Sequence, residues 1–192
     1  MRDSPFAYFD ETAPGPINQA RGKILNLSPR ALVVLELLRA SGAALTTSML
    51  AWYLGCKKQA MQRNMYSLQR AGLAYLLDCF RDGHSVRVWL ASTIPVPSTR
   101  ESARLAALGL LYLRLRSEHE KLGWETLPGA LARMVINKEH LVEPVRRGEK
   151  PNGKATLLVH PTMEEARQNT PGGKLYTADT VLLSGDADIM FR

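Results

Sequence analysis

The chain has 192 residues, of which 45% are hydrophobic and 22% are charged, and its formal net charge is +7. This composition is typical of a folded globular protein, and it excludes a chain that is disordered over most of its length. The basic balance predicts attraction to polyanions such as nucleic acid.

Residues 1–27 are predicted to form an N-terminal arm. Prolines and a glycine interrupt the segment, and it shows neither helical nor strand periodicity. We expect the arm to pack on the core through its aromatic residues Phe6, Tyr8 and Phe9. The alternative is that Arg21 and Lys23 contact a minor groove, as the arms of some DNA-binding domains do.

The first helix is predicted from Ser28 to Gly42. Ser28 supplies an N-cap hydroxyl, and Pro29 suits the first helical position because its missing N–H is no loss there. Gly42 is a typical C-terminal stop. The apolar residues that helical spacing turns toward the core are Leu32, Val34, Leu35, Leu37 and Leu38.

Residues 46–72 predict a helix-turn-helix. Thr46 or Thr47 caps a short helix, and Gly55 permits a turn. A second helix then runs from Lys57 or Lys58 to Gly72. The residues on its inner seam are Met61, Met65 and Leu68. Its other faces carry long basic side chains and amides, a mixture suited to phosphates and base edges.

After Gly72 the hydrophobic period changes from helical to alternating. Leu73, Tyr75 and Leu77 face one way, and a second alternating run follows from Val86 to Leu90. An Asp-Gly pair at 82–83 separates the two runs, which predicts a β-hairpin.

Three helices followed by a hairpin, over residues 28–92, resemble the winged helix-turn-helix family of DNA-binding domains. The resemblance is carried by Ser28-Pro29-Arg30, by Leu45-Thr46-Thr47, by Leu68 with Gly72-Leu73, and by the return strand 86–90. It implies that the helix beginning near Lys57 enters the major groove and that the hairpin is the wing.

Residues 93–98 contain two prolines and no charge, which predicts a stiff linker. Ser98 and Glu101 then form a capping box that opens a long helix reaching to about Gly123. Apolar residues repeat along this helix at steps of three and four, so we expect it to be buried against a domain or a second subunit. A homodimer formed through the 98–123 helix is one reading.

The remainder of the 99–192 segment predicts a small α/β domain, so the fold class is α+β. Residues 128–135 and 162–168 are expected to be helical. Residues 155–160 and 175–183 are expected to be strands.

Several residues invite a comparison with enzymes. Glu125, Asp179, Asp186 and Asp188 are carboxylates that a metal-dependent nuclease would need. The stretch 176–183 resembles the first acid-bearing strand of PD-(D/E)xK nucleases. A winged helix followed by such a domain also resembles the replication-relaxation family of mobile elements. No acid-x-lysine follows, and we therefore expect solvated acids on a domain that is not catalytic.

Other enzyme motifs are weaker still. The turn 148–155 nearly spells a phosphate-binding P-loop, but alanine replaces the Ser or Thr that would hold magnesium. The four histidines are isolated, and the two cysteines, Cys56 and Cys79, offer neither a disulfide framework nor a zinc site. We expect no cofactor and no catalytic residue.

Apolar runs and the N-terminus bear on location. The longest apolar run, 105–113, is too short to cross a bilayer, and the N-terminus lacks the apolar region of a signal peptide. We therefore expect a cytoplasmic protein without a membrane partner.

The charge distribution favours one surface as the partner site. Residues 28–98 carry eight basic and three acidic side chains, whereas residues 99–192 carry fourteen and twelve. Residues 37–77 contain no acidic side chain at all. We therefore predict sequence-specific binding of double-stranded DNA, in transcription regulation or in replication and transfer of a plasmid or other mobile element. The alternatives are a metal-dependent nuclease or relaxation enzyme, and an adaptor whose winged helix binds protein.

The predicted interface has two groups of residues. Those nearest the bases are Lys57, Lys58, Gln59, Gln62 and Arg63, because the early residues of a recognition helix point into the groove. Those expected on phosphates or in the groove of the wing are Arg39, Tyr66, Arg70, Arg81 and Arg87.

Overall fold

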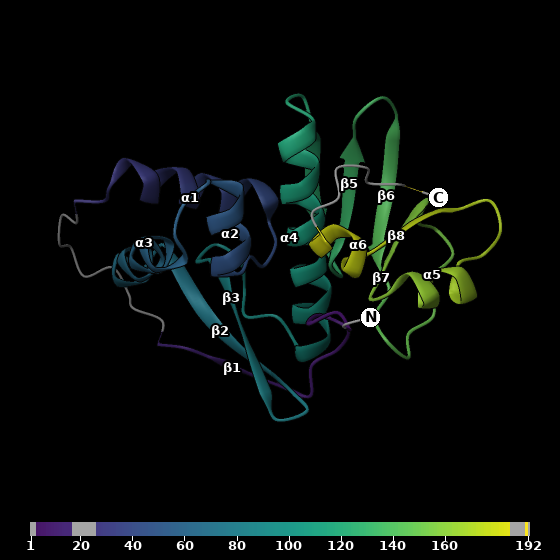
Figure 1. Cartoon of the computed structure of the whole chain (residues 1–192), viewed down its shortest axis with the longest axis horizontal. Helices are drawn as coiled ribbons and strands as arrows, with labels where there is room; N and C mark the ends of the chain where they lie inside the picture. The colour runs from purple at the N-terminus through teal and green to yellow at the C-terminus, as the bar shows by residue number, and fades with distance from the viewer. Residues whose placement is uncertain (1–2, 17–25, 185–190, 192) are drawn as a thin grey trace.

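The computed structural model describes residues 3–16, 26–184 and 191. It is a mixed α+β structure, with three consecutive helices and a hairpin before the long helix α4 and mainly strands after it. The helices are α1 (Pro29–Ser41), α2 (Thr47–Tyr53), α3 (Lys58–Arg70), α4 (Thr99–Glu118), α5 (Met163–Asn169) and α6 (Asp179–Ser184). The strands are β1 (Glu11–Pro14), β2 (Ala74–Arg81), β3 (His84–Ala91), β4 (Gly123–Leu127), β5 (Leu131–Val135), β6 (Glu139–Pro144), β7 (Leu157–His160) and β8 (Leu175–Ala178). Figure 1 shows α1–α3 and the first sheet on one side of α4, and the second sheet on the other.

Helix α1 begins and ends as its sequence predicts. The Ser28 hydroxyl accepts a hydrogen bond from the Ala31 N–H at 3.1 Å, and Gly42 takes the left-handed conformation at the other end with a φ of 55°. One core prediction is wrong, because Leu32 is 48% exposed. The buried arc of the helix is centred on Ala31 and Leu38, and Leu32 lies about 100° around the helix from Ala31, on the solvent side.

Helices α2 and α3 are joined by a four-residue turn. Gly55 in that turn has a φ of 57°, a conformation that an L side chain rarely adopts. The predicted inner seam of α3 is confirmed, since Met61, Met65 and Leu68 are all fully buried. In Figure 1, α3 is seen nearly down its axis while α2 runs across the view, so the two helices cross steeply.

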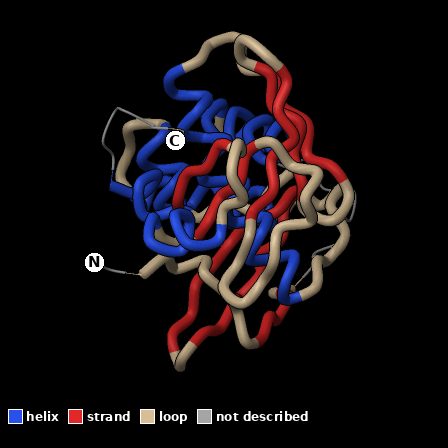
Figure 2. Tube along the Cα trace, turned by 90° about the vertical axis from the view of Figure 1, so that its right-hand side faces the viewer, coloured by secondary structure: helices blue, strands red, loops and turns tan. Residues whose placement is uncertain are grey.

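The hairpin of β2 and β3 is confirmed, and it is attached to the helices. Asp82 and Gly83 form its two-residue turn, both with positive φ, as a type I′ turn requires. Leu45, just before α2, exchanges two backbone hydrogen bonds with Trp89 of β3, at 3.0 and 2.8 Å. The tip projects from the lower end of the molecule in Figures 1 and 2.

The N-terminal arm departs from its prediction by contributing a strand. Residues 11–14 form β1, which pairs antiparallel with β2 and makes a three-stranded sheet. Sheet pairing supplied by β2 overrides the absence of a local strand pattern. Phe6 and Phe9 are buried, as expected for an arm packed on the core. Arg21 and Lys23 lie outside the described residues.

Helix α4 is the central element of the molecule. The capping box is confirmed, with Ser98 and Glu101 each bonded to the other's backbone N–H. The helix ends at Glu118 rather than near Gly123, because Gly123 already belongs to β4. Nearly every side chain from 102 to 115 is buried within this chain. The apolar stripe that led to the dimer reading is therefore already covered, and pairing of two copies stays an untested prediction.

The second sheet has the order β4-β5-β6-β7-β8. Its first three strands are antiparallel, and β7 and β8 join in parallel. The helix predicted over 128–135 is wrong: residues 131–135 form β5, because pairing with β4 and β6 overrides the helical propensity of this leucine- and alanine-rich stretch. Strand β6 was not predicted. The strand predicted over 175–183 ends at Ala178, where α6 begins.

One continuous core joins the two sheets and α4, across the predicted linker 93–98. Tyr75 of β2 donates a hydrogen bond to the carbonyl of Pro95 at 3.1 Å, which fixes that linker to the first sheet. In the part of the chain that the structure describes, no helix combines the length and the apolar character needed to cross a bilayer.

Candidate nucleic-acid interface

Helix α3 presents two adjacent rows of polar side chains. The outer row is Gln59, Arg63, Tyr66 and Arg70, at steps of four, three and four, and all four side chains are exposed. The neighbouring row, Lys58 and Gln62, faces α2 and β3. The methionine and leucine seam on the opposite face holds α3 against α1 and α2, so both rows sit on a rigid helix.

The basic side chains of α3 are not neutralised by described carboxylates. Lys57, Lys58, Arg63 and Arg70 are exposed and take part in none of the salt bridges among the described residues. The reason is in the sequence, since residues 37–77 contain no acid. These four cations therefore remain available to an external anion.

Several polar residues of α3 make contacts within the chain. Asn64 accepts a hydrogen bond from the Ser28 hydroxyl at 2.9 Å and donates to the Ala60 carbonyl at 3.2 Å. Ser67 donates to the Arg63 carbonyl one turn back. Tyr66 touches Trp89 edge-on, with ring centroids 5.6 Å apart, and its hydroxyl accepts from the Gln62 amide at 3.4 Å. Gln62 and Tyr66 are thus held in position beside β3.

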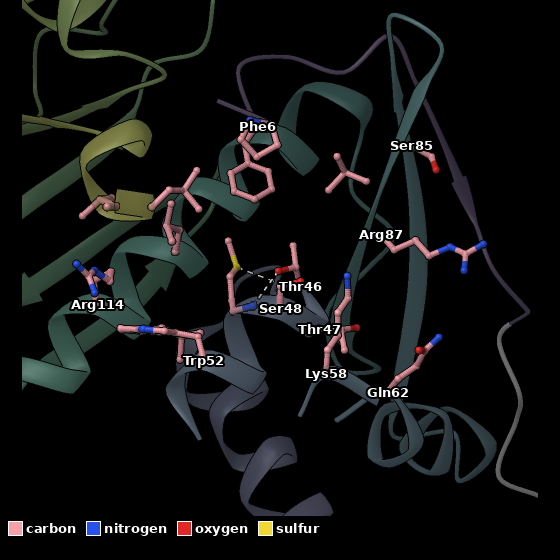
Figure 3. Close-up of a pocket in the computed structure, with 17 residues that line it drawn as sticks. Phe6, Thr46, Thr47, Ser48, Trp52, Lys58, Gln62, Ser85, Arg87 and Arg114 are labelled. Atoms are coloured by element: carbon pink, nitrogen blue, oxygen red, sulfur yellow. Dashed lines mark hydrogen bonds between the residues drawn. The ribbon is translucent and has the colours of Figure 1, made fainter. Parts of the chain in front are cut away.

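Arg87 of β3 joins the α3 cations at one place. Its side chain is 58% exposed and its Nε donates to the Asp78 carboxylate at 2.9 Å. It lines, together with Lys58 and Gln62, a groove of about 730 Å³ bounded by α2, α3, β3, α4 and α6. In Figure 3 the Lys58 side chain points into this space, whereas Arg87 extends away from its centre.

Arg81 is removed from the predicted interface. Its side chain is only 17% exposed, because it binds the Asp3 carboxylate, the Ser4 carbonyl and its neighbour Asp82. Its guanidinium also stacks on the Tyr8 ring at 4.5 Å. The N-terminal arm therefore pairs the charge of Arg81 and covers its side chain. The position of the arm could not be predicted from the sequence.

The tip of the hairpin is acidic rather than basic. The Tyr8 hydroxyl donates to the Asp82 carboxylate at 2.7 Å, and the Asp82 N–H donates to Asp10 at 3.0 Å. Burial alone would raise the pKa of Asp3, but hydrogen bonds from Arg147 and Arg81 outweigh it and lower that pKa to about 2. Carboxylates at this end repel phosphates, so the part of the hairpin suited to DNA is the stretch near Arg87.

Arg39 is exposed but lies apart from α3. It belongs to the last turn of α1, whereas α1 meets α3 through Ser28 at its first turn. Arg39 is eleven positions after Ser28, which corresponds to about 16 Å along the helix axis. The other end of α1 contacts β4 instead, where the Ser41 carbonyl accepts from Trp124 and Thr126. Arg39 is thus not part of the α3 surface, and its contact with a phosphate stays an untested prediction.

Glu125 and Asp179, the two described carboxylates among those considered for metal binding, do not converge. Glu125 on β4 is exposed and paired with Arg133 at 3.1 Å. Asp179 is fully buried at the end of β8, bonded to Arg146 and to the Ser4 hydroxyl, both at 2.6 Å. Strands β4 and β8 are opposite edges of the sheet, about 19 Å apart. Asp186 and Asp188 lie outside the described residues.

The described residues also hold no group of three or more His, Cys, Asp or Glu that could bind a metal ion. The turn at 148–155, which partly resembles a P-loop, leads into strand β7 and not into a helix. A P-loop needs the helix so that backbone amides and dipole meet the phosphates. Neither arrangement is that of an active site built on these residues.

Sequence reasoning missed part of the groove. Thr47 was considered only as a cap, and Ser48, Trp52 and Arg114 were given no role. Trp52 is 48% exposed, and the Arg114 guanidinium lies 4.8 Å from its ring centre. The available signal was the position of Trp52 on the solvent face of α2, one residue outside the buried pair Leu50 and Ala51. The contribution of α4 depends on tertiary packing and has no local signal.

Comparisons with protein-family models, with curated proteins and with solved structures give no match for this chain. Its function therefore has to be argued from its own residues.

Proposed function

We propose that residues 28–92 form a winged helix-turn-helix that binds double-stranded DNA in a sequence-specific manner, with α3 in the major groove. The main observation in support is that the exposed face of α3 bears cations and amides, and that no described carboxylate pairs with those cations. Such a protein would act in transcription regulation or in the replication and transfer of a mobile element.

The dimensions of α3 fit the groove. Its thirteen residues give a length of about 20 Å, and the major groove of B-DNA, about 12 Å wide, admits one helix. The turn between α2 and α3 has the length and the glycine that are common in helix-turn-helix units. The buried seam of α3 occupies one side of the helix and leaves the other side free to contact DNA.

The side chains on that face match the chemistry of base edges. Arg63 can donate two hydrogen bonds to guanine, and Gln59 and Gln62 can each bond adenine in a bidentate manner. Lys57, Lys58 and Arg70 suit phosphate oxygens.

The hairpin supports the same surface from the side. Its strand β3 is bonded to Leu45 ahead of α2, and Arg87 lies at the edge of the groove that Lys58 also lines. We place the backbone contact of the hairpin at Arg87, because the tip carries Asp82 and its partner Asp10.

Fluorescence anisotropy with labelled duplexes tests the proposal. If Lys57, Lys58, Arg70 and Arg87 each neutralise a phosphate, log affinity should fall against log salt with a slope of about −3.6. The affinity should then drop roughly 150-fold between 50 and 200 mM salt. Absence of binding at low salt would show that the helix face serves another partner, such as a protein.

A matched pair of variants tests the surface itself. Arg63→Ala should weaken binding by about 1–3 kcal/mol if Arg63 reads a guanine. Lys138→Ala removes the same charge from an exposed turn between β5 and β6, far from α3 in sequence, and should leave binding within about twofold. Equal weakening by both variants would indicate attraction by net charge alone. Selection of bound duplexes from a random pool then gives the recognised sequence.

A further inference from the structure

We propose that the groove between α2, α3, β3, α4 and α6 binds a small anionic molecule with an apolar body, and that this ligand competes with DNA. The competition rests on the DNA-binding function proposed above. Binding of the ligand itself does not rest on that function, because it depends only on the residues that line the groove.

The groove has the size and floor of a small-molecule site. Its volume of about 730 Å³ falls in the range of pockets that hold drug-sized ligands. The apolar side chains that line it are Phe6, Met49, Val86, Leu110, Leu113 and Leu182. They come from the N-terminal arm, from helices α2, α4 and α6 and from strand β3. The site is therefore formed only when the two halves of the chain pack together.

The charge of the groove selects an anion. Its described lining includes no carboxylate and three cationic side chains, Lys58, Arg87 and Arg114. Arg87 is paired with Asp78 and extends away from the centre, and Arg114 lies over the Trp52 ring, so Lys58 is the cation on which anion binding depends. Lys58 points into the space (Figure 3) and forms none of the salt bridges among the described residues. A carboxylate, sulfonate or phosphate beside it would gain a charge-assisted hydrogen bond.

Hydroxyl groups complete the polar edge of the groove. Thr47 accepts a hydrogen bond from the Trp89 indole at 3.0 Å, which orients its oxygen and leaves its own O–H to donate. Ser48 is exposed on the next residue of α2. The expected ligand therefore places its anionic group near Lys58 and Thr47 and its apolar body toward Leu110 and Leu113.

The same residues connect the groove to the proposed DNA surface. Lys58 and Gln62 line the groove and also form the inner row of α3. An anion bound to the Lys58 ammonium occupies a donor that a phosphate would otherwise use. A ligand in the groove should therefore weaken DNA binding without unfolding the protein.

Two probes with the same ring system separate charge from hydrophobicity. 8-Anilinonaphthalene-1-sulfonate carries an anion, and N-phenyl-1-naphthylamine is the same body without it. We expect saturable one-site fluorescence binding of the sulfonate to the full chain, weakened about tenfold by Lys58→Gln. Lys138→Gln, which removes an exposed lysine that does not line the groove, should have no effect. Ser48→Trp should fill the groove and abolish binding of both probes while the melting temperature stays near that of the wild type.

The outcomes distinguish the two proposals. Equal binding of both probes, unchanged by Lys58→Gln, would overturn the anion site. Absence of probe binding to the wild type, in protein that binds duplex DNA, would overturn the ligand proposal alone. Probe binding without any DNA binding would overturn the proposed function and the competition, and would leave the anion site supported. Displacement of labelled duplex by the sulfonate from the wild type, but not from Ser48→Trp, would support competition.

Discussion

Gly109→Ala tests how closely α4 approaches the segment that leads into α2. A methyl group at Gly109 would lie 2.2 Å from the carbonyl oxygen of Ala44 and 2.7 Å from Cδ2 of Leu45. Real Cβ contacts are essentially never shorter than 3.0 Å, so helix and segment would have to separate by at least 0.8 Å.

The segment cannot retreat without losing hydrogen bonds. Ala44 donates to the Leu105 carbonyl of α4 at 3.2 Å, and Leu45 is bonded twice to Trp89 on its other side. Overpacking of this kind costs about 1–3 kcal/mol, and a lost backbone hydrogen bond costs about 1 kcal/mol more. Helix propensity works in the opposite direction, because alanine is better than glycine by about 1 kcal/mol. The expected net loss in the free energy of unfolding is about 1–3 kcal/mol.

Urea denaturation followed by tryptophan fluorescence measures this loss. Gly172→Ala is the matched control, because its added Cβ meets no atom within 4 Å and its φ is not positive. It should change stability by less than about 0.5 kcal/mol. If Gly109→Ala is as stable as the wild type or more stable, the gain in helix propensity outweighs any steric cost, and the close approach of α4 to Ala44 is refuted.

Three further predictions concern buried and bound charges. Asp179→Asn leaves the buried Arg146 guanidinium without its carboxylate and should cost about 3–5 kcal/mol in urea denaturation; a loss under 1 kcal/mol, typical of an exposed pair, would contradict the buried pairing. Burial, with a smaller effect of Arg146, lowers the pKa of His160 from 6.5 to about 4. The unfolded chain therefore binds the extra proton first, and stability present above pH 6.5 should fall by about 3 kcal/mol as the pH drops to 4. His160→Gln should remove that part of the pH dependence, and a variant that keeps the wild-type pH profile would assign it to other groups. Arg81→Ala should leave the salt slope of DNA binding unchanged while Arg70→Ala, which removes a proposed phosphate contact, reduces it by about 0.9, as measured by anisotropy; an equal reduction would place Arg81 in the interface.

Local chemistry in the sequence determined the elements of the N-terminal half. Helix ends depend on caps next to them in the chain, so Ser28 with Pro29, and Ser98 with Glu101, were recognisable without the fold. The same holds for the Asp82-Gly83 turn and for the buried seam of α3. The exposed cations of α3 were also predictable, because a run without acids offers no carboxylate nearby in the chain.

Tertiary structure decided everything that depends on partners distant in sequence. Strands β1 and β5 exist because other strands pair with them, and a stretch such as 131–135 carries no sign of that pairing in its own residues. From the sequence, Arg81 was expected to be a free cation on the wing, whereas in the structure the N-terminal arm places Asp3 and Tyr8 against it. The groove beside Lys58 likewise needs α4, some fifty residues further along the chain. A side chain's type and spacing are local properties, whereas its burial, its ion partner and the cavity it faces are set only when distant segments pack together.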